Sequence, residues 1–312
     1  MSKSDPKTVW EAGKDKYYEH YRLSKSATSA ELRKWVDEAY YKNGLCQYLD
    51  KNFTHELRDN DFYARLWELE VAEWLEKTGI KMLPTNGKGF DFCLELPDGK
   101  KIWIEAVLAT EDDELKEIQR QALQSGAVFN TPREQFALRY SSVLFTKATK
   151  IKEKYLQDVG KDDFTLIAVS GYPMSMMGSS MDLFMLGILP IDFQVVHIST
   201  DGKPLDPNVP RPTHTMKQSY QKKTGASVKK EFLYPGTHFP FIDGVMFSEA
   251  SNLQQLLGTG SASFNEETNC PHIFENYVGK SLPEDFTKFF YCHSFKDSGN
   301  MASLEMKEPT VK

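Results

Sequence analysis

The chain has 312 residues, of which 40% are hydrophobic and 26% are charged, and its net charge is −6. This composition excludes a disordered chain and supplies enough apolar side chains for a packed core. No apolar run approaches the roughly 18 residues of a membrane-spanning helix, and residues 1–15 lack the apolar core of a signal peptide. The four cysteines form no C-x-x-C pair, which argues against a structural zinc site or a disulfide framework. We therefore expect a cytoplasmic protein that has no contact with membranes.

Residues 1–60 are predicted to form a polar helical segment, in which 27–41 is the clearest helix. Ser26, Thr28 and Ser29 are candidate caps, and Glu31 stands three residues after Thr28, as in a capping box. The segment is expected to be an N-terminal subdomain or arm.

A stronger helix is predicted over 61–77, where Asp61 can cap the start and Gly79 can end it. Apolar residues form two stripes at helical spacing, so the helix is expected to lie between two layers. One stripe comprises Phe62, Leu66 and Leu69, and the other comprises Trp67, Val71, Trp74 and Leu75.

A short strand over 80–83 and a β-hairpin over 89–107 follow the helix. Pro97-Asp98-Gly99 fits a three-residue connection with Gly99 in the left-handed region, which places Leu96 opposite Lys100. This register pairs Leu94 with Ile102, Phe92 with Ile104 and Phe90 with Ala106 on one apolar face. On the other face it pairs Glu95 with Lys101, Cys93 with Trp103 and Asp91 with Glu105.

The remainder adds helices over 111–125 and 133–158 and a buried strand over 164–170. The resulting order α-β-β-β-α-β predicts an α/β fold with a mixed central sheet flanked by helices. Weaker patterns indicate strand pieces over 182–198, an insertion at about 200–238, a strand over 241–248, a short helix over 251–257 and a frayed polar end. We thus expect an N-terminal helical segment (1–60), a core (61–280) and a C-terminal tail (281–312).

The hairpin register would set two carboxylates, Asp91 and Glu105, directly opposite each other, with Cβ atoms about 5 Å apart. Like charges in that position are destabilising unless a cation lies between them or one carboxyl holds a proton. An exposed pair that repels weakly is the alternative. Glu68 borders the Val71 and Leu75 stripe and can reach the same place, although an ion pair with Arg65 also explains it.

Two other glutamates of the same helix, Glu70 and Glu73, are expected to be solvated.

A helix with Glu68, a strand with Asp91 and a hairpin to a strand with Glu105 resemble the PD-(D/E)XK, or restriction-endonuclease-like, core. The resemblance implies that Asp91 and Glu105 bind Mg²⁺ or Mn²⁺, with Glu68 as a further metal or water ligand. Val107 stands where that superfamily has its lysine, and some members supply the basic group from the next helix. The next helix here carries Arg139, Lys147 and Lys150, of which Lys147 is the predicted catalytic lysine. The alternative is that Lys147 is an exposed lysine on an amphipathic helix. The stretches RLWEL, IWIEAV, RYSSVLFTK and FIDGVMFS are also similar to an uncharacterised group of bacterial proteins.

Several basic residues are candidates for binding the phosphate backbone. Arg139 and Lys147 are eight residues apart, hence on nearly the same helix face. The segment 217–230 carries five lysines, which form either a phosphate-gripping arm or a solvated loop. The nucleic-acid-binding candidates are Arg65, Arg139, Lys150, Lys222 and Lys223.

These features predict a metal-dependent endonuclease that acts on nucleic acid, with DNA favoured and a role in defence or in a mobile element. A homodimer is expected if both strands of a duplex are cut. The alternative is a non-catalytic nucleic-acid or protein-binding module that keeps a nuclease-like core. A third hypothesis is a scaffold whose N-terminal helices bind a protein partner.

Overall fold

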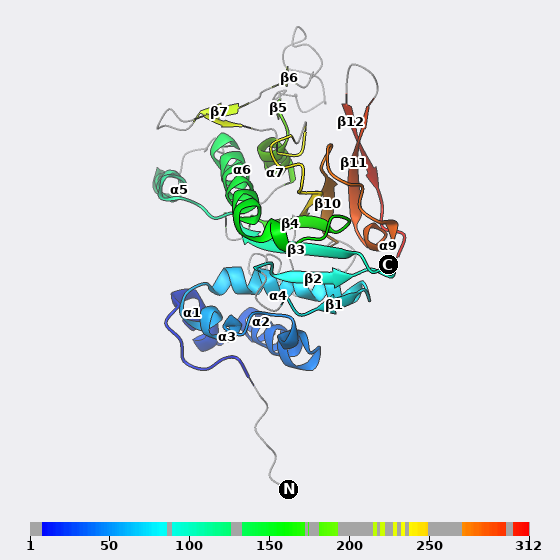
Figure 1. Ribbon diagram of the computed structural model, residues 1–312. Coiled ribbons are helices and arrows are strands. Elements are labelled where there is room, and N and C mark those ends of the chain that lie inside the picture. Colours follow the sequence, from blue (N-terminus) through cyan, green and yellow to red (C-terminus); the bar gives the residue numbers. More distant parts are fainter. Residues whose placement is uncertain are drawn as a thin grey trace, which may run out of the picture.

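The chain folds as an α/β structure in which a mixed eight-stranded sheet is flanked by helices and an N-terminal helical segment packs below it (Figure 1). The predicted fold class is thereby confirmed. The computed structural model describes residues 8–85, 89–125, 133–171, 174, 181–192, 215–216, 219–221, 227–229, 232–234, 237–248, 270–297 and 302–311.

The sheet has the strand order β1-β2-β3-β4-β9-β10-β11-β12. Its strands are β1 (Lys81–Leu83), β2 (Phe92–Glu95), β3 (Lys101–Leu108), β4 (Phe164–Ser170), β9 (Gly244–Ser248), β10 (His272–Glu275), β11 (Tyr291–Asp297) and β12 (Ala302–Lys307). Strands β3, β4 and β9 run parallel, as do β10 and β11, and the other neighbours are antiparallel. Two small two-stranded sheets join β5 (Ile191–Asp192) to β6 (Thr215–Met216) and β7 (Ser219–Gln221) to β8 (Ser227–Lys229).

The N-terminal helical segment contains α1 (Lys16–Leu23), α2 (Ala27–Asp37) and α3 (Phe53–Asp59). Asp15 caps α1, and Ser26 caps α2 by accepting a hydrogen bond from the Ser29 amide. Ser26 is thus the cap of the second helix, in place of the predicted Thr28 and Glu31 capping box. A π-helix over Glu38–Lys42 extends α2 through the end of the predicted helix.

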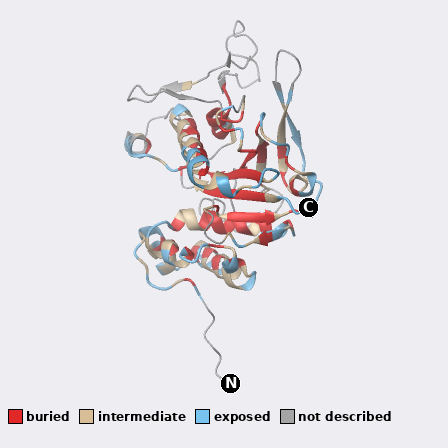
Figure 2. Ribbon diagram, viewed as in Figure 1, coloured by how far each residue is buried: buried red, intermediate tan, exposed pale blue. Residues whose placement is uncertain are grey.

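The remaining helices are α4 (Phe62–Lys77), α5 (Asp113–Ser125), α6 (Arg133–Lys150), α7 (Met181–Ile188) and α9 (Glu284–Thr287). Helix α4 lies on one face of the sheet and α6 lies on the other, and buried residues line both inner surfaces (Figures 1 and 2). Both apolar stripes of α4 are buried, as predicted. Asp61 precedes α4 but makes no capping hydrogen bond through its side chain, so that prediction is wrong.

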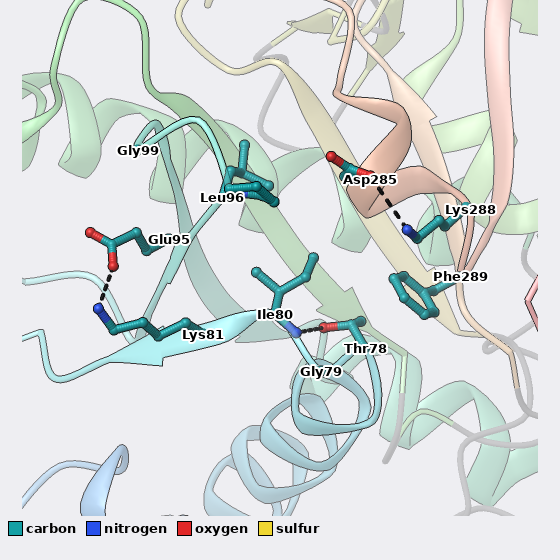
Figure 3. Close-up of a pocket in the computed structure, with 11 residues that line it drawn as sticks. Thr78, Gly79, Ile80, Lys81, Glu95, Leu96, Gly99, Asp285, Lys288 and Phe289 are labelled. Atoms are coloured by element: carbon teal, nitrogen blue, oxygen red, sulfur yellow. Dashed lines mark hydrogen bonds and ion pairs between the residues drawn. The ribbon is translucent and has the colours of Figure 1, made fainter.

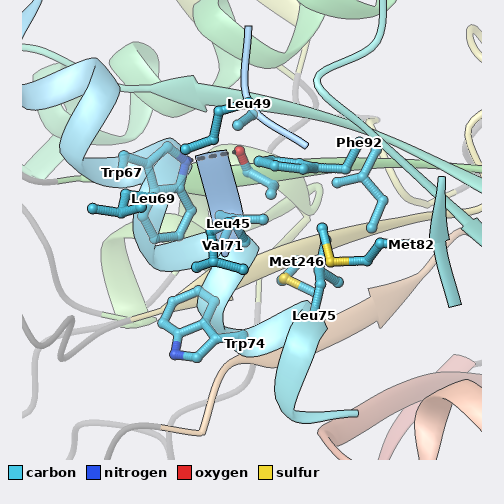
Figure 4. Packing of buried hydrophobic residues seen from close by; sticks show 14 of the residues in the cluster. Leu45, Leu49, Trp67, Leu69, Val71, Trp74, Leu75, Met82, Phe92 and Met246 are labelled. Carbon is cyan, nitrogen blue, oxygen red and sulfur yellow. Dashed lines mark hydrogen bonds between the residues drawn. The ribbon is translucent and has the colours of Figure 1, made fainter. Parts of the chain in front are cut away.

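Helix α4 joins the sheet through apolar contacts and one buried hydrogen bond. Leu69, Val71 and Leu75 belong to the same buried hydrophobic cluster as Phe92 of β2 (Figure 4). The indole nitrogen Nε1 of Trp67 donates to the carbonyl of Ala168 in β4, 3.2 Å away. This hydrogen bond fixes the position of α4, which carries Glu68, relative to the central strand β4.

The hairpin between β2 and β3 confirms most of the predicted register. Gly99 has φ +82°, the Leu96 amide donates to the Lys100 carbonyl at 2.8 Å, and Phe92 pairs with Ile104. The prediction fails before Phe92, because the chain bends there. Phe90 then packs with Trp103 on the α6 side, opposite to the face that Phe92 occupies.

Two predictions for the second half of the chain are wrong in whole or in part. Strand pieces were expected over 182–198, but residues 181–188 form α7, and a strand appears only after Pro190, as β5; a short apolar stretch such as MDLFMLGI does not distinguish a buried helix from a strand. The end predicted to be frayed contains β12, which pairs with β11 at the sheet edge.

The helical stretch predicted over 133–158 is confirmed in extent. It is α-helical to Lys150 and continues as a π-helix over Ile151–Tyr155 and a 3₁₀ turn.

The predicted helix over 251–257 and most of the predicted insertion at about 200–238 lie outside the described residues. In the described part of the chain, no helix is both long and apolar enough to cross a membrane.

Candidate metal and catalytic site

Four side chains predicted to form the site come from four separate elements. Glu68 projects from α4, Asp91 lies directly before β2, Glu105 lies in β3 and Lys147 lies in the last turn of α6. The ionisation of each of the carboxyls Glu68 and Asp91 responds to the charges of Glu105 and Lys147. The fold therefore brings the four residues to one place.

Glu105 is the most buried member of the group, with 1% of its surface exposed. Its Oε1 atom accepts a hydrogen bond from Lys147 Nζ at 2.6 Å, and Lys150 Nζ lies 3.6 Å from the same oxygen. Its Oε2 atom is buried and has no hydrogen-bond partner in the part of the chain that the structure describes. A carboxylate in such a place is costly unless cations compensate it, and the two lysines of α6 provide that compensation.

Asp91 accepts a hydrogen bond from the Ala106 amide through Oδ2, at 2.7 Å. In a regular hairpin, the pairing of β2 with β3 would continue from Phe92 back to Asp91. The bond between the Ala106 amide and the Asp91 carboxylate takes the place of that pairing. Burial, followed by the charge of Glu105, raises the pKa of Asp91 to about 7 against the opposing charge of Lys147. Asp91 thus exchanges a proton near neutral pH.

Glu68 is buried in α4 and is bound by a neighbouring arginine. Arg65 Nη1 lies 2.5 Å from Glu68 Oε2. Burial raises the pKa of Glu68 well above its ordinary value, and the charge of Asp91 raises it further, whereas Arg65 and Lys147 act in the opposite direction. The helix ion pair with Arg65 that the sequence allowed is present, together with the proximity to Asp91.

The other glutamates of α4 differ from expectation. Glu70 is fully buried instead of solvated, because α4 is covered on both sides. Glu73 is part-buried and accepts a hydrogen bond from Trp35 Nε1 at 3.0 Å, so it ties α4 to the N-terminal helical segment.

The donor set is of the type that a hard divalent cation prefers, because its oxygens are carboxylates and Glu105 Oε2 is a buried acceptor without a partner among the described residues. Within the described ranges, however, no three His, Cys, Asp or Glu side chains are grouped closely enough to hold a metal ion. Asp91 and Glu105 interact electrostatically, and Arg65 binds Glu68.

The loop that leads into Asp91 rests against Tyr155. Gly89 has φ +86°, and a Cβ atom there would overlap the Tyr155 ring. That ring also lies 5.8 Å from the Phe90 ring, centre to centre, and Lys150 Nζ lies 5.1 Å from its centre. Burial alone would lower the pKa of Lys150, but its hydrogen bond to Tyr155 and the charge of Glu105 raise it.

The position of Tyr155 follows from the π-helix, whose wider turn stacks residues five apart. Lys150 and Tyr155 have that spacing. The sequence suggested neither the π-helix nor the role of Tyr155, because an α-helical pattern places residues three and four apart on one face.

Replacing Gly89 with alanine is expected to lower the free energy of unfolding by about 2–4 kcal/mol, because a left-handed residue gains a Cβ atom and the Tyr155 ring must move. Gly99→Ala is the matched control, since Gly99 has φ +82° with open space around it and should lose only about 1 kcal/mol. Urea unfolding of both variants measures the difference. Equal losses would show that Tyr155 does not support the loop.

The structure separates the predicted nucleic-acid-binding residues. Lys150 joins Lys147 beside Glu105, whereas Arg65 is occupied by glutamates. Arg139 lies elsewhere and donates to the Thr110 carbonyl at 2.6 Å. Lys222 and Lys223 lie outside the described residues.

An open groove of about 550 Å³ lies where the end of α4, the β1–β2 edge and α9 meet (Figure 3). Its charged side chains are already paired, Lys81 with Glu95 and Lys288 with Asp285. None of the candidate site residues lines this groove, so the carboxylate group is a separate feature.

No model of a known protein family, no curated protein and no solved structure matches this chain. A function for this chain therefore has to be inferred from the site itself.

Proposed function

We propose that this protein is a metal-dependent nuclease that hydrolyses phosphodiester bonds of nucleic acid, with DNA favoured. The observation that carries the proposal is the position of Lys147 Nζ, which lies 2.6 Å from the buried carboxylate of Glu105. The charge of Glu105 in turn raises the pKa of Asp91. A lysine beside paired carboxylates is the arrangement that the resemblance to the PD-(D/E)XK superfamily implies. Lys147 would supply the basic group that is missing at Val107, the position where that superfamily has its lysine.

Asp91 and Glu105 would hold Mg²⁺ or Mn²⁺ through carboxylate oxygens, and Glu68 would be the third ligand or would orient water. The bound ion supplies Lewis-acid stabilisation of the charge that develops on the phosphate. Lys147 would donate a hydrogen bond to the attacking water or to a phosphate oxygen. Lys150, whose side chain is 40% exposed, would contact a phosphate of the substrate.

The test is cleavage of supercoiled DNA, single-stranded DNA and RNA with Mg²⁺ or Mn²⁺. We expect cleavage by the wild type and its loss in Asp91→Ala and in Glu105→Ala, because each variant removes a cation ligand. Circular dichroism establishes that both variants fold. Asp98→Ala, which removes an exposed carboxylate of the same hairpin, should cleave like the wild type.

A folded wild type that binds nucleic acid but cuts no substrate would contradict the proposal. It would favour the non-catalytic module, in which the lysines of α6 only compensate Glu105. A homodimer and a role in defence or in a mobile element belong to the same proposal and stay predictions.

A further inference from the structure

One side of α6 and of the π-helix that follows it carries three lysines. Lys147, Lys150 and Lys154 are three and four residues apart, so they lie on the same side of the helix. We call these three residues the lysine flank. Lys152 is two residues away from both Lys150 and Lys154, and it therefore lies on another side. The helix thus presents three of its four last lysines in one row.

The lysine flank holds more positive charge than the buried Glu105 carboxylate needs. Lys147 Nζ lies 2.6 Å from Glu105 Oε1, and Lys150 Nζ lies 3.6 Å from the same oxygen. Exposure of the side chains rises along the flank, from 24% for Lys147 to 40% for Lys150, and Lys154 is exposed. Within the described part of the chain, Lys154 forms no ion pair. The outer end of the flank is therefore available to an anion that comes from solution.

Tyr155 fixes the middle lysine of the flank. Lys150 Nζ lies 5.1 Å from the centre of the Tyr155 ring, and a hydrogen bond joins the two side chains. The ring rests in turn on Gly89, where a Cβ atom would overlap it, and on the Phe90 ring, 5.8 Å away centre to centre. The position of the Lys150 ammonium group is thus tied to the loop that leads into Asp91.

We propose that the lysine flank binds neighbouring phosphates of one nucleic-acid strand through Lys150 and Lys154, with Tyr155 as the positioning residue of Lys150. The inference rests on the proposed nuclease function, but it requires no bound metal ion. Side chains four residues apart on a helix have Cβ atoms about 5–6 Å apart, so both ammonium groups can contact the same strand. Because contacts to phosphates carry no sequence information, the flank would hold substrates of any base sequence beside the carboxylate site.

Fluorescence anisotropy with labelled single-stranded and duplex oligonucleotides in EDTA measures binding without cleavage. Lys154→Gln should weaken binding about 5- to 10-fold at about 0.1 M salt, because one phosphate contact is lost. The slope of log K against log salt should become less steep by about 0.7 for a single strand and about 0.9 for a duplex. Lys152→Gln is the matched control, since it changes the net charge equally on another side of the helix and should leave affinity and slope unchanged.

Tyr155→Phe separates positioning from packing. The variant keeps the ring on Gly89 but loses the hydroxyl that bonds Lys150, so it should fold like the wild type and bind the oligonucleotide more weakly. In a Lys150→Gln background, the same change should have no effect on binding. Equal losses with and without Lys150 would show that Tyr155 does not act through it.

Equal losses in Lys152→Gln and Lys154→Gln would overturn the inference, because net charge would then explain the binding. A wild-type salt slope in Lys154→Gln, or a loss that depends on the base sequence of the oligonucleotide, would overturn it too. A wild type that binds no oligonucleotide at low salt would overturn the proposed function as well. Cleavage that depends on Asp91, together with an unchanged salt slope in Lys154→Gln, overturns this inference alone.

Discussion

Lys147→Met is expected to lower metal-dependent cleavage by about 100- to 1,000-fold, the range found when a single stabilising donor is removed from an active site. It should also lower the free energy of unfolding by about 3 kcal/mol, because Glu105 stays buried while losing its nearest cation. Lys150, 3.6 Å from the same oxygen, limits the loss. Cleavage rates and urea unfolding measure the two effects.

Two variants control this prediction. Lys150→Met should lose less stability, because Lys150 lies farther from Glu105 and is more exposed. Adding Glu105→Gln to Lys147→Met should restore most of the lost stability, because the buried charge is then gone. If the double variant is no more stable than Lys147→Met, the loss comes from packing and the ion pair is not its cause.

The contribution of Asp91 to the stability of the protein without metal is expected to decrease as the pH rises from about 4 to about 7. Asp91 has its pKa raised from 3.8 to about 7 in the folded state, because the carboxyl is buried beside Glu105. A raised pKa means that the folded protein binds the proton more tightly, so this stabilisation is full below the unfolded pKa. It is lost as the pH rises through the folded pKa, for a total of at most about 4 kcal/mol. Glu68 acts in the same direction.

Urea unfolding of the wild type and Asp91→Asn between pH 4.5 and 8 tests this expectation. The variant cannot ionise at this position, so the wild type should lose stability relative to the variant over the interval. Asp98→Asn is the control, since the hydrogen bond to Lys100 lowers the pKa of Asp98 and its removal should change the curve slightly in the opposite direction. If the free energies of unfolding of the wild type and of Asp91→Asn change in parallel with pH, Asp91 does not hold a proton near neutral pH.

Local patterns in the sequence were sufficient to predict the helix and the strands that carry the site residues. The two stripes of α4 predicted its burial on both sides, and Pro97-Asp98-Gly99 predicted the β2–β3 register as far as Phe92. Both results follow from rules that act within a few residues: helical periodicity, strand alternation and turn geometry. For the same reason, the sequence placed Asp91 and Glu105 near each other and Glu68 on the adjoining helix.

Apart from the Arg65–Glu68 pair within α4, only the tertiary structure decided which cations meet these carboxylates. Lys147 reaches Glu105 across 42 residues, whereas Arg139 on the same helix binds the Thr110 carbonyl. The π-helix after Lys150 brings Tyr155 to Gly89, and α3 brings Glu56 to Arg65. Such contacts depend on how whole elements pack, and no local pattern encodes that. The sequence by itself thus determined the acidic residues and the elements that carry them, while packing determined their partners and raised the pKa values of Asp91 and Glu68 through burial.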